Sequence, residues 1–398
     1  MTRSELARLL REHLLCGHLI DRAGAPLLIG PYGREAMRDV AIEEWRGASP
    51  VYTRRTQQLL GFGRGDVETV FKGMQIDIGA PPQFMDFRYR VVDEGHGEFW
   101  LAHCGALMDV EPMGDDFVVA MCHHIEDPTF DATACATDPR ARMTPIHRPP
   151  RRPADRHPHC HWNVVIEPDA EALPEPDEAV RMGGTRAAQL PVATIDPTDE
   201  GHSDYARPLE ADLRFEDFSP SALRALLDEV ALQHHLLALS FLDAVGRRWG
   251  AEAAREIGRR QLTGIAGVTA GRLAALLGVE GGGAAGVAAV LHVHPAFRPR
   301  SYVDLRVEEG EARVAVSLGD CEALHEEVAP SWAQLLAGGG QAPLAAIAQA
   351  VDPTARVEEL GERSWSVVLD PAAPPAKEPS EVTLTKFSTG ADFQFAER

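Results

Sequence analysis

The sequence predicts an α+β protein built from two copies of one unit, each a helical layer followed by an antiparallel sheet. Residues 6–62 align with residues 223–279 without a gap. In the first part of each copy, apolar residues recur at helical spacing. In the second part, short segments rich in β-branched residues lie between Gly and Pro turns. Helices followed by strands within each copy are typical of an α+β arrangement.

The duplication helps to distinguish residues that build the fold from residues that form a functional site. Residues that both copies keep belong to the shared fold, whereas residues that only one copy has are candidates for a functional site. The repeated Asp-Pro is interpreted as structural, because Asp before Pro forms turns. The matched positions are His18 with His235, Gly33 with Gly250, Cys104 with Cys321, Asp138-Pro139 with Asp352-Pro353, and Trp162 with Trp365.

Apolar periodicity and capping residues place the helices. Ser219 and Pro220 form a good start for a helix in the second copy, with Ser219 as the N-cap. Gly61 and Gly63 are expected to end the last helix of the first layer. The predicted helices are 4–22, 32–45 and 52–60 in the first copy, and 221–249, 251–257 onward, 264–277, 331–337 and 342–350 in the second.

Strands are predicted where the period changes to two and Val, Tyr and Phe become frequent. Two further short strands are expected after Asp352, and they end at residues 365–368. The remaining predicted strands are 84–92 and 98–103 in the first copy, 287–293, 302–307 and 312–318 in the second, and a final hairpin within 381–395.

The predicted organisation has four parts. Residues 1–166 form the first repeat, which is rich in Cys and His, and 214–370 form the second. Residues 167–213 are an acidic, Pro-rich linker, and 371–398 are a C-terminal spacer and hairpin. Two fused copies are expected to pack as a pseudo-dimer within one chain, through their sheets or their first helices.

Composition narrows the possible partners. The 398 residues include 39 basic and 60 acidic side chains, for a net charge of −21. This balance argues against a nucleic-acid surface or a polybasic membrane anchor. No signal peptide and no transmembrane segment is expected. Six unevenly spaced Cys in such a chain are interpreted as free thiols of a cytoplasmic protein.

The candidate chemistry lies in the first copy. Four of the 6 Cys and eight of the 16 His fall within residues 96–161. If residues 159–165 form a strand, His159 and His161 share one face, and Cys160 lies with Trp162 in the core. His159, His161, His123 and Cys104 are then predicted ligands of a transition metal, zinc or iron.

Two other interpretations of the same residues stay open. Cys122 is a candidate nucleophile, with His124 as its base, since a thiolate next to an imidazole is reactive. Alternatively, the segment is an ordinary His-rich loop with inert thiols. The sequence predicts that the 122–124 and 159–161 segments converge in a pocket of the first half only.

Several short motifs resemble one family. Cys122, Asp138-Pro139-Arg140, Arg148-Pro149-Pro150 and His159-Cys160-His161-Trp162 follow one another in the first copy, and Trp249 to Ala254 form a matching helical core in the second. In this order they resemble the L-2-amino-thiazoline-4-carboxylic acid hydrolase-like superfamily and its bacterial relatives, here in duplicate. The resemblance implies hydrolytic opening of a small ring. The second copy departs from the pattern, because Arg363 and Ser364 replace the Cys-His pair.

The sequence therefore predicts a hydrolase or lyase that acts on a C–N or C–S bond of a small molecule, through the site in the first repeat. The alternative is a non-catalytic protein that binds a metal, haem or another small ligand. Both interpretations use the same residue types, so the sequence does not separate them.

Overall fold

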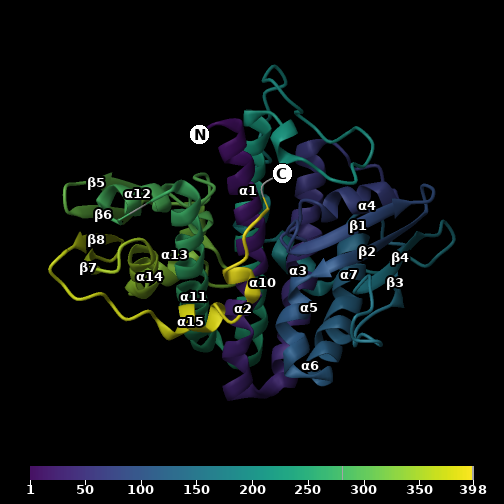
Figure 1. The fold of residues 1–398 in the computed structure, drawn as a ribbon, viewed down its shortest axis with the longest axis horizontal. Helices are drawn as coiled ribbons and strands as arrows, with labels where there is room; N and C mark the ends of the chain where they lie inside the picture. The colour runs from purple at the N-terminus through teal and green to yellow at the C-terminus, as the bar shows by residue number, and fades with distance from the viewer. Residues whose placement is uncertain (280, 397–398) are drawn as a thin grey trace.

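A computed structural model of the chain describes residues 1–279 and 281–396. Long helices fill its centre, and a four-stranded antiparallel sheet lies toward each end (Figure 1). This is the predicted α+β class, with helices preceding the sheet in each of two similar halves.

The first half alternates helices and strands in the order that the repeat predicts. The strand prediction for this half is close, with the two expected strands at 85–91 and 96–104. Its elements are α1 (Arg3–His18), α2 (Ile20–Gly24), α3 (Pro26–Leu60), α4 (Val67–Met74), β1 (Met85–Val91), β2 (His96–Cys104), α5 (Gly105–Val110), α6 (Asp115–Val119), a π-helical turn (Ala120–Ile125), α7 (Glu126–Cys135), β3 (Ala141–His147) and β4 (Cys160–Ile166).

The second half follows the same order after two short helices in the connecting segment. These are α8 (Asp177–Gly183) and α9 (Arg186–Gln189). The remaining elements are α10 (Pro220–Trp249), α11 (Ala251–Leu277), α12 (Ala284–Val293), β5 (Leu305–Glu309), β6 (Arg313–Leu318), α13 (Trp332–Ala337), α14 (Gln341–Val351), β7 (Ala355–Gly361), β8 (Ser364–Leu369) and α15 (Ser380–Thr385), with a final 3₁₀ turn (Thr389–Ala391).

The two sheets share order and register. Their strand orders are β1-β2-β4-β3 and β5-β6-β8-β7. Trp162 pairs with Phe99 in the first sheet, and Trp365 pairs with the matching Val316 in the second. Each outer pair also carries an irregularity at the same place, before His147 and before Gly361. Both tryptophans are fully buried, so the conserved face of each sheet is its core face.

One pair of glycines explains how the helical layers correspond. Gly33 has φ of +87° and Gly250 has φ of +91°, a backbone region that favours glycine. Gly250 separates α10 from α11, whereas Gly33 lies inside the long α3. The backbone stays helical through Pro50, so the two helices predicted at 32–45 and 52–60 are one helix.

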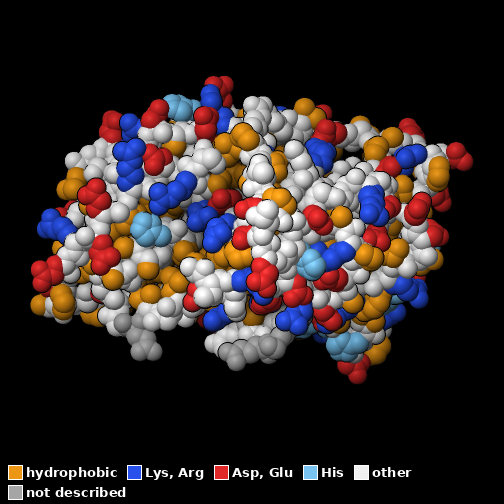
Figure 2. Space-filling model, turned by 90° about the horizontal axis from the view of Figure 1, so that it is seen from above, with side chains coloured by type: hydrophobic (Ala, Val, Ile, Leu, Met, Phe, Trp, Pro, Cys, Tyr) orange, Lys and Arg blue, Asp and Glu red, His pale blue; other side chains and the backbone are white. Residues whose placement is uncertain are grey.

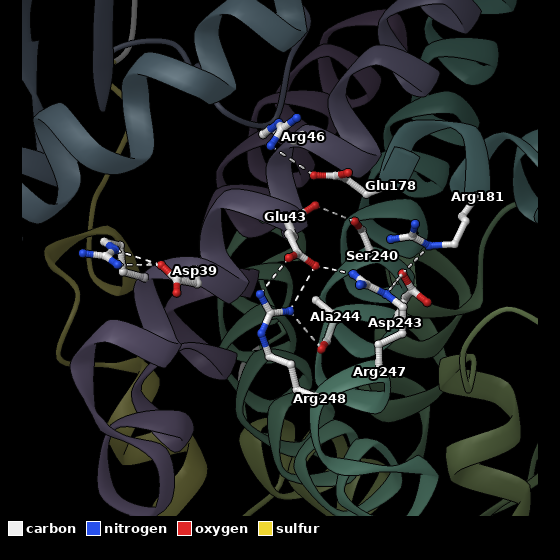
Figure 3. Close-up of polar contacts among 11 residues, drawn as sticks. Asp39, Glu43, Arg46, Glu178, Arg181, Ser240, Asp243, Ala244, Arg247 and Arg248 are labelled. Carbon is white, nitrogen blue, oxygen red and sulfur yellow. Dashed lines mark hydrogen bonds and ion pairs between the residues drawn. The ribbon is translucent and has the colours of Figure 1, made fainter. Parts of the chain in front are cut away.

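The halves meet through their first helices, one of the two predicted modes. Arg55 of α3 forms a buried ion pair with Glu229 of α10, with 2.7 Å between Nη2 and Oε1. Nearby, Arg248 of α10 donates to Glu43 of α3, and Arg181 of α8 donates to Asp243 of α10 (Figure 3). Charges on α3, α8 and α10 are thus paired with one another across the junction.

The segment that follows each sheet crosses to the other half. In the first half, α8 packs on α3, and the next turn reaches the second half, where the backbone N–H of Arg186 donates to Glu326. In the second half, α15 packs on α11, and the N–H of Thr389 donates to Asp109 of the first half. Asp109 and Glu326 occupy matching positions of the repeat. The predicted linker thus contains a structured, exchanged segment.

Three predicted elements are wrong. Residues 287–293 belong to the helix α12, because an alanine-rich segment between glycines favours a helix even when it is fully apolar. Strand β5 begins at Leu305 rather than at 302. The C-terminal hairpin within 381–395 is instead α15 and a 3₁₀ turn, because this segment packs against the helix α11 and not along a strand edge.

In the described part of the chain, no helix is both long enough and apolar enough to cross a membrane. Acidic and basic side chains are interspersed over the face seen in Figure 2, without a continuous basic area.

Candidate functional site

Cys104 and His159 are neighbours at the end of strand β2. The Cys104 N–H donates to His159 Nδ1 over 3.1 Å, and Cys104 Sγ accepts from Leu107 N at the start of α5 over 3.3 Å. Burial raises the pKa of Cys104 to about 12 and lowers that of His159 to about 4. Cys104 is thus a protonated helix cap, and Nδ1 of His159 is already in use as an acceptor.

Residues 122–124 lie in the π-helical turn between α6 and α7. Cys122 is 2% exposed within the core of the first half, and burial raises the pKa of its thiol far above the usual range. His123 Nε2 lies 2.6 Å from the carbonyl oxygen of Pro149, and His124 is exposed. The thiol and the proposed base therefore lie in different environments, which disfavours a thiolate nucleophile.

His161 lies on the face of the first sheet that is opposite the core face. Its Nε2 is 2.8 Å from Glu98 Oε2 on the neighbouring strand β2, where the side chain is partly exposed. Cys160 and Trp162 are both buried on the core face, as predicted from strand alternation.

The predicted ligands are thus divided among three places. Cys104 and His159 lie at the end of β2, His123 lies on the π-helical turn, and His161 lies on the open face of the sheet. Among residues 1–279 and 281–396, no three His, Cys, Asp or Glu side chains are grouped so as to hold a metal ion. The zinc or iron centre stays a prediction, without an assembled set of ligands among these residues.

The first half contains a cavity that the sequence did not predict. It has a volume of about 430 Å³ and lies between α3, the core face of the first sheet and the α6–α7 segment. Its wall is mostly apolar and includes Met37, Trp45, Phe87, Phe130 and Met143. This size and lining are typical of small-molecule sites.

One wall of the cavity is polar and incompletely paired. Arg22 donates to Asp21 Oδ2 over 2.8 Å, and its Nε lies 3.7 Å from Asp109 Oδ2. Within the described structure, Asp21 Oδ1 has no hydrogen-bond partner. Both ring nitrogens of His18 also lack a regular hydrogen bond, although the Ile78 backbone is close. Buried polar groups are normally hydrogen-bonded, so this wall is a candidate ligand contact.

Two further carboxyl groups line the cavity. Asp77 accepts from the Tyr52 hydroxyl over 2.8 Å and from the Gly79 N–H over 2.7 Å, and burial raises its pKa to about 6. Glu126 follows the π-helical turn, and burial raises its pKa to about 8. Among the described residues, no hydrogen bond or ion pair to the Glu126 carboxyl is found. Perturbed pKa values in a cavity are typical of functional sites.

The C-terminal segment closes one side of the cavity. Leu384, Phe387 and Ser388 contribute to its lining. Ser388 Oγ donates to Asp109 Oδ2 over 2.5 Å, whereas the Phe387 ring is 78% exposed. The crossing segment from the second half is therefore part of the site in the first half.

The second half fills the matching space with aromatic rings. His235, the counterpart of His18, donates from Nε2 to the Arg298 carbonyl oxygen over 2.9 Å. Its ring centroid lies 4.8 Å from that of Tyr302 and 5.1 Å from that of Trp332. Both rings are buried, and they stand where the first half has Met85 and Asp115.

A signal for the cavity was present in the sequence. Under the gapless alignment, Asp21 and Arg22 fall on Ala238 and Leu239, and Tyr52 falls on Thr269. The second copy lacks these polar groups, and the distribution of Cys and His alone does not reveal their loss. Polar side chains found in one copy alone, on buried helix positions, mark the wall of the cavity.

Comparisons of the chain with protein-family models, with curated proteins and with solved structures find no match. The resemblance to the thiazoline hydrolase superfamily therefore stays a prediction, and the interpretation of the site depends on its own geometry.

Proposed function

We propose that this protein binds a small, largely apolar molecule in the cavity of its first half. The observation that carries the proposal is the cavity itself, of about 430 Å³, with an apolar lining and one wall of unsatisfied polar atoms on His18 and Asp21. An apolar space with a few convergent polar groups is the usual form of a specific ligand site.

Ligand binding is favoured over Cys-dependent hydrolysis by the state of the thiols. Burial raises the pKa of Cys122 and of Cys160 well above the usual thiol range. Neither thiol provides the thiolate that attack on a substrate requires. The binding proposal needs no reactive thiol, because the apolar lining supplies most of the interaction.

A second candidate is a hydrolase or lyase that works in the same cavity through carboxyl groups. The specific observation is that burial raises the pKa of Asp77 to about 6 and that of Glu126 to about 8. One group is mainly ionised and the other mainly protonated at neutral pH, so the pair suits proton abstraction and proton donation.

The binding proposal is tested with N-phenyl-1-naphthylamine, an uncharged probe that fluoresces in apolar surroundings. We expect saturable binding of one probe per chain. Ala41, which lines the cavity, is replaced by Phe to fill the space, and this variant should lose the probe. The matched control, Ala285→Phe, adds the same side chain at an exposed position of α12 and should keep it. Equal binding by the two variants contradicts the proposal.

A further inference from the structure

We propose that the cavity selects a molecule whose apolar body carries one protonated amine, with the amine held at Asp21. This inference rests on the proposed binding function and adds the chemical class of the ligand. It follows from the charges and the unpaired atoms along the polar wall of the cavity.

The wall holds more carboxyl groups than cations. Arg22 is paired with Asp21 and lies near Asp109. Glu44 of α3 belongs to the same group, because its carboxyl interacts with the Asp21 carboxyl and the Arg22 guanidinium, and burial raises its pKa well above the usual range. The carboxylates of Asp21 and Asp109 and the carboxyl of Glu44 thus surround one guanidinium. Buried carboxylates are stable only when they are paired, so the arrangement lacks positive charge.

The missing positive charge coincides with unpaired atoms. Neither Oε atom of Glu44 has a hydrogen-bond partner in the described part of the chain, and the side chain is fully buried. Asp21 Oδ1 also lacks a regular hydrogen bond, although the Trp45 indole is close, and Asp21 lines the cavity directly. An ammonium group at this wall would donate to Asp21 Oδ1 and supply charge that Arg22 alone does not.

An anionic ligand does not fit the same wall. Arg22 is the only Lys or Arg among the described lining residues. Its Nη1 donates to Asp21, and its Nε, which has no hydrogen-bond partner in the described structure, lies 3.7 Å from Asp109 Oδ2. A bound carboxylate or phosphate would therefore compete with Asp21 and Asp109 for this one guanidinium and would also lie near Asp77. Like charges brought together in a site of low polarity repel one another strongly.

The rest of the cavity fits an aromatic or branched aliphatic body. Phe87 and Phe130 contribute rings, and Met37 and Met143 contribute flexible thioether chains. Methionine adapts to the shape of a ligand, and aromatic faces attract a nearby cation. The lining thus favours an amine with a compact apolar group.

The test compares three compounds with the same body, 2-phenylethylamine, 2-phenylethanol and phenylacetate, by displacement of N-phenyl-1-naphthylamine from the full-length chain. We expect the amine to compete at least ten-fold better than the alcohol, and phenylacetate to compete worst. Asp21→Asn should reduce the amine to the level of the alcohol, with each competition measured relative to the probe affinity of that same variant. Glu44→Gln, the second variant, replaces a carboxyl whose pKa burial raises well above its usual range, so it should weaken the amine less than Asp21→Asn does.

Asp39→Asn is the matched control. Asp39 is a paired carboxylate on the same helix α3, outside the cavity lining, and its loss should leave the ten-fold preference unchanged. Equal competition by amine and alcohol, or stronger competition by phenylacetate, overturns the amine assignment while the binding function stands. Failure of the probe itself to bind overturns the binding function as well, so the two failures are distinct.

Discussion

The two halves of this chain share a sheet order and a register but differ in what lies between sheet and helices. In the first half the space is a cavity with a polar wall, and in the second it holds the rings of Tyr302 and Trp332. The difference is carried by a few side chains on an unchanged backbone plan. The scaffold therefore tolerates either a cavity or a packed core at the same place.

The comparison also separates two kinds of polar residue. Asp109 and Glu326 are acidic in both halves, and each accepts from the segment that crosses over from the other half. Asp21 and Asp77 are acidic in the first half only, where the second has Ala238 and His294. The shared acids accept from the crossing segments, and Asp109 also lines the cavity, whereas the unshared acids Asp21 and Asp77 line the cavity and, in the described part of the chain, form no hydrogen bond to these segments.

The largest expected effect comes from removing a buried aromatic ring from the second half. Trp332→Ala removes a ring that is 4% exposed and contacts His235. We expect a loss of about 3–5 kcal/mol in the free energy of unfolding, because the transfer term and the cavity term add. Urea denaturation measures it. Trp249→Ala, which removes a partly exposed Trp stacked on Tyr32, is the control and should cost less. A loss below that of the control would mean that Trp332 is not a filling residue.

The next effect depends on pH. The pKa of Glu126 is raised to about 8 in the folded chain, from an ordinary value of 4.5. Its contribution to stability is complete below pH 4.5 and is lost as the pH rises through about 8. Glu126→Gln cannot ionise, so it should match the wild type at pH 4.5. At pH 9 it should exceed the wild type by on the order of 2–4 kcal/mol, after allowance for the water that reaches the group.

Denaturation at both pH values checks this prediction. The exposed Glu35→Gln serves as the control, and its difference from the wild type should stay constant with pH. A pH-independent difference for Glu126→Gln would mean that the cavity does not hold its carboxyl in the protonated state.

The crossing segments predict a smaller, reciprocal pair of effects. Asp109→Ala removes the acceptor of Ser388 and Thr389, and Glu326→Ala removes the acceptor of Arg186 and of the Ala187 N–H. Each change should cost about 1–3 kcal/mol of local stability, typical of hydrogen bonds to a charged group. Amide exchange should accelerate in residues 380–391 for the first variant and in residues 185–190 for the second.

Each of these two variants is the control for the other. If both segments loosened in either variant, the two contacts would not be independent. Unchanged exchange in both would mean that the carboxylates do not anchor the segments.

The smallest effect concerns the predicted ligand His161. Its contact with Glu98 lies on the open face of the sheet, and the second half has Ser364 at the matching place. We expect His161→Ala to cost about 0.2–1 kcal/mol, as for other partly exposed ion pairs. Thermal unfolding with and without a chelator measures it. If the stability difference between wild type and His161→Ala is larger than this without chelator and shrinks when chelator is added, a metal at His161 is favoured.

Alternation and turn residues are local signals, so they predicted most strands of the two sheets, although β3 was not predicted and β5 was placed too early. The strand pair around Trp162 and Trp365 was found in this way, and the buried face was correct. These signals failed for α12 and the C-terminal segment, where the deciding factor is the helix α11 against which each packs. Val-rich segments adopt either form, and tertiary contacts decide between them.

The candidate site was predicted only in its broad location. The half that was predicted to hold a site does contain the cavity. The named Cys and His residues, however, lie in the core of that half or on the open face of its sheet. Residue type suggested metal or thiol chemistry, whereas exposure and pairing depend on long-range packing. Cys122 illustrates the limit, since its burial follows from a π-helical turn that no local pattern announces.

The covalent fusion of the two copies has a consequence for how such a site can evolve. In a symmetric pair of identical chains, every substitution occurs twice, so a destabilising cavity is opened twice as well. Here the segments that cross at Asp109 and Glu326 belong to one chain and are free to diverge. One half can accept the energetic cost of an empty space while the other keeps its packed rings. The duplicated chain thus holds a cavity in one half and packed aromatic rings in the other.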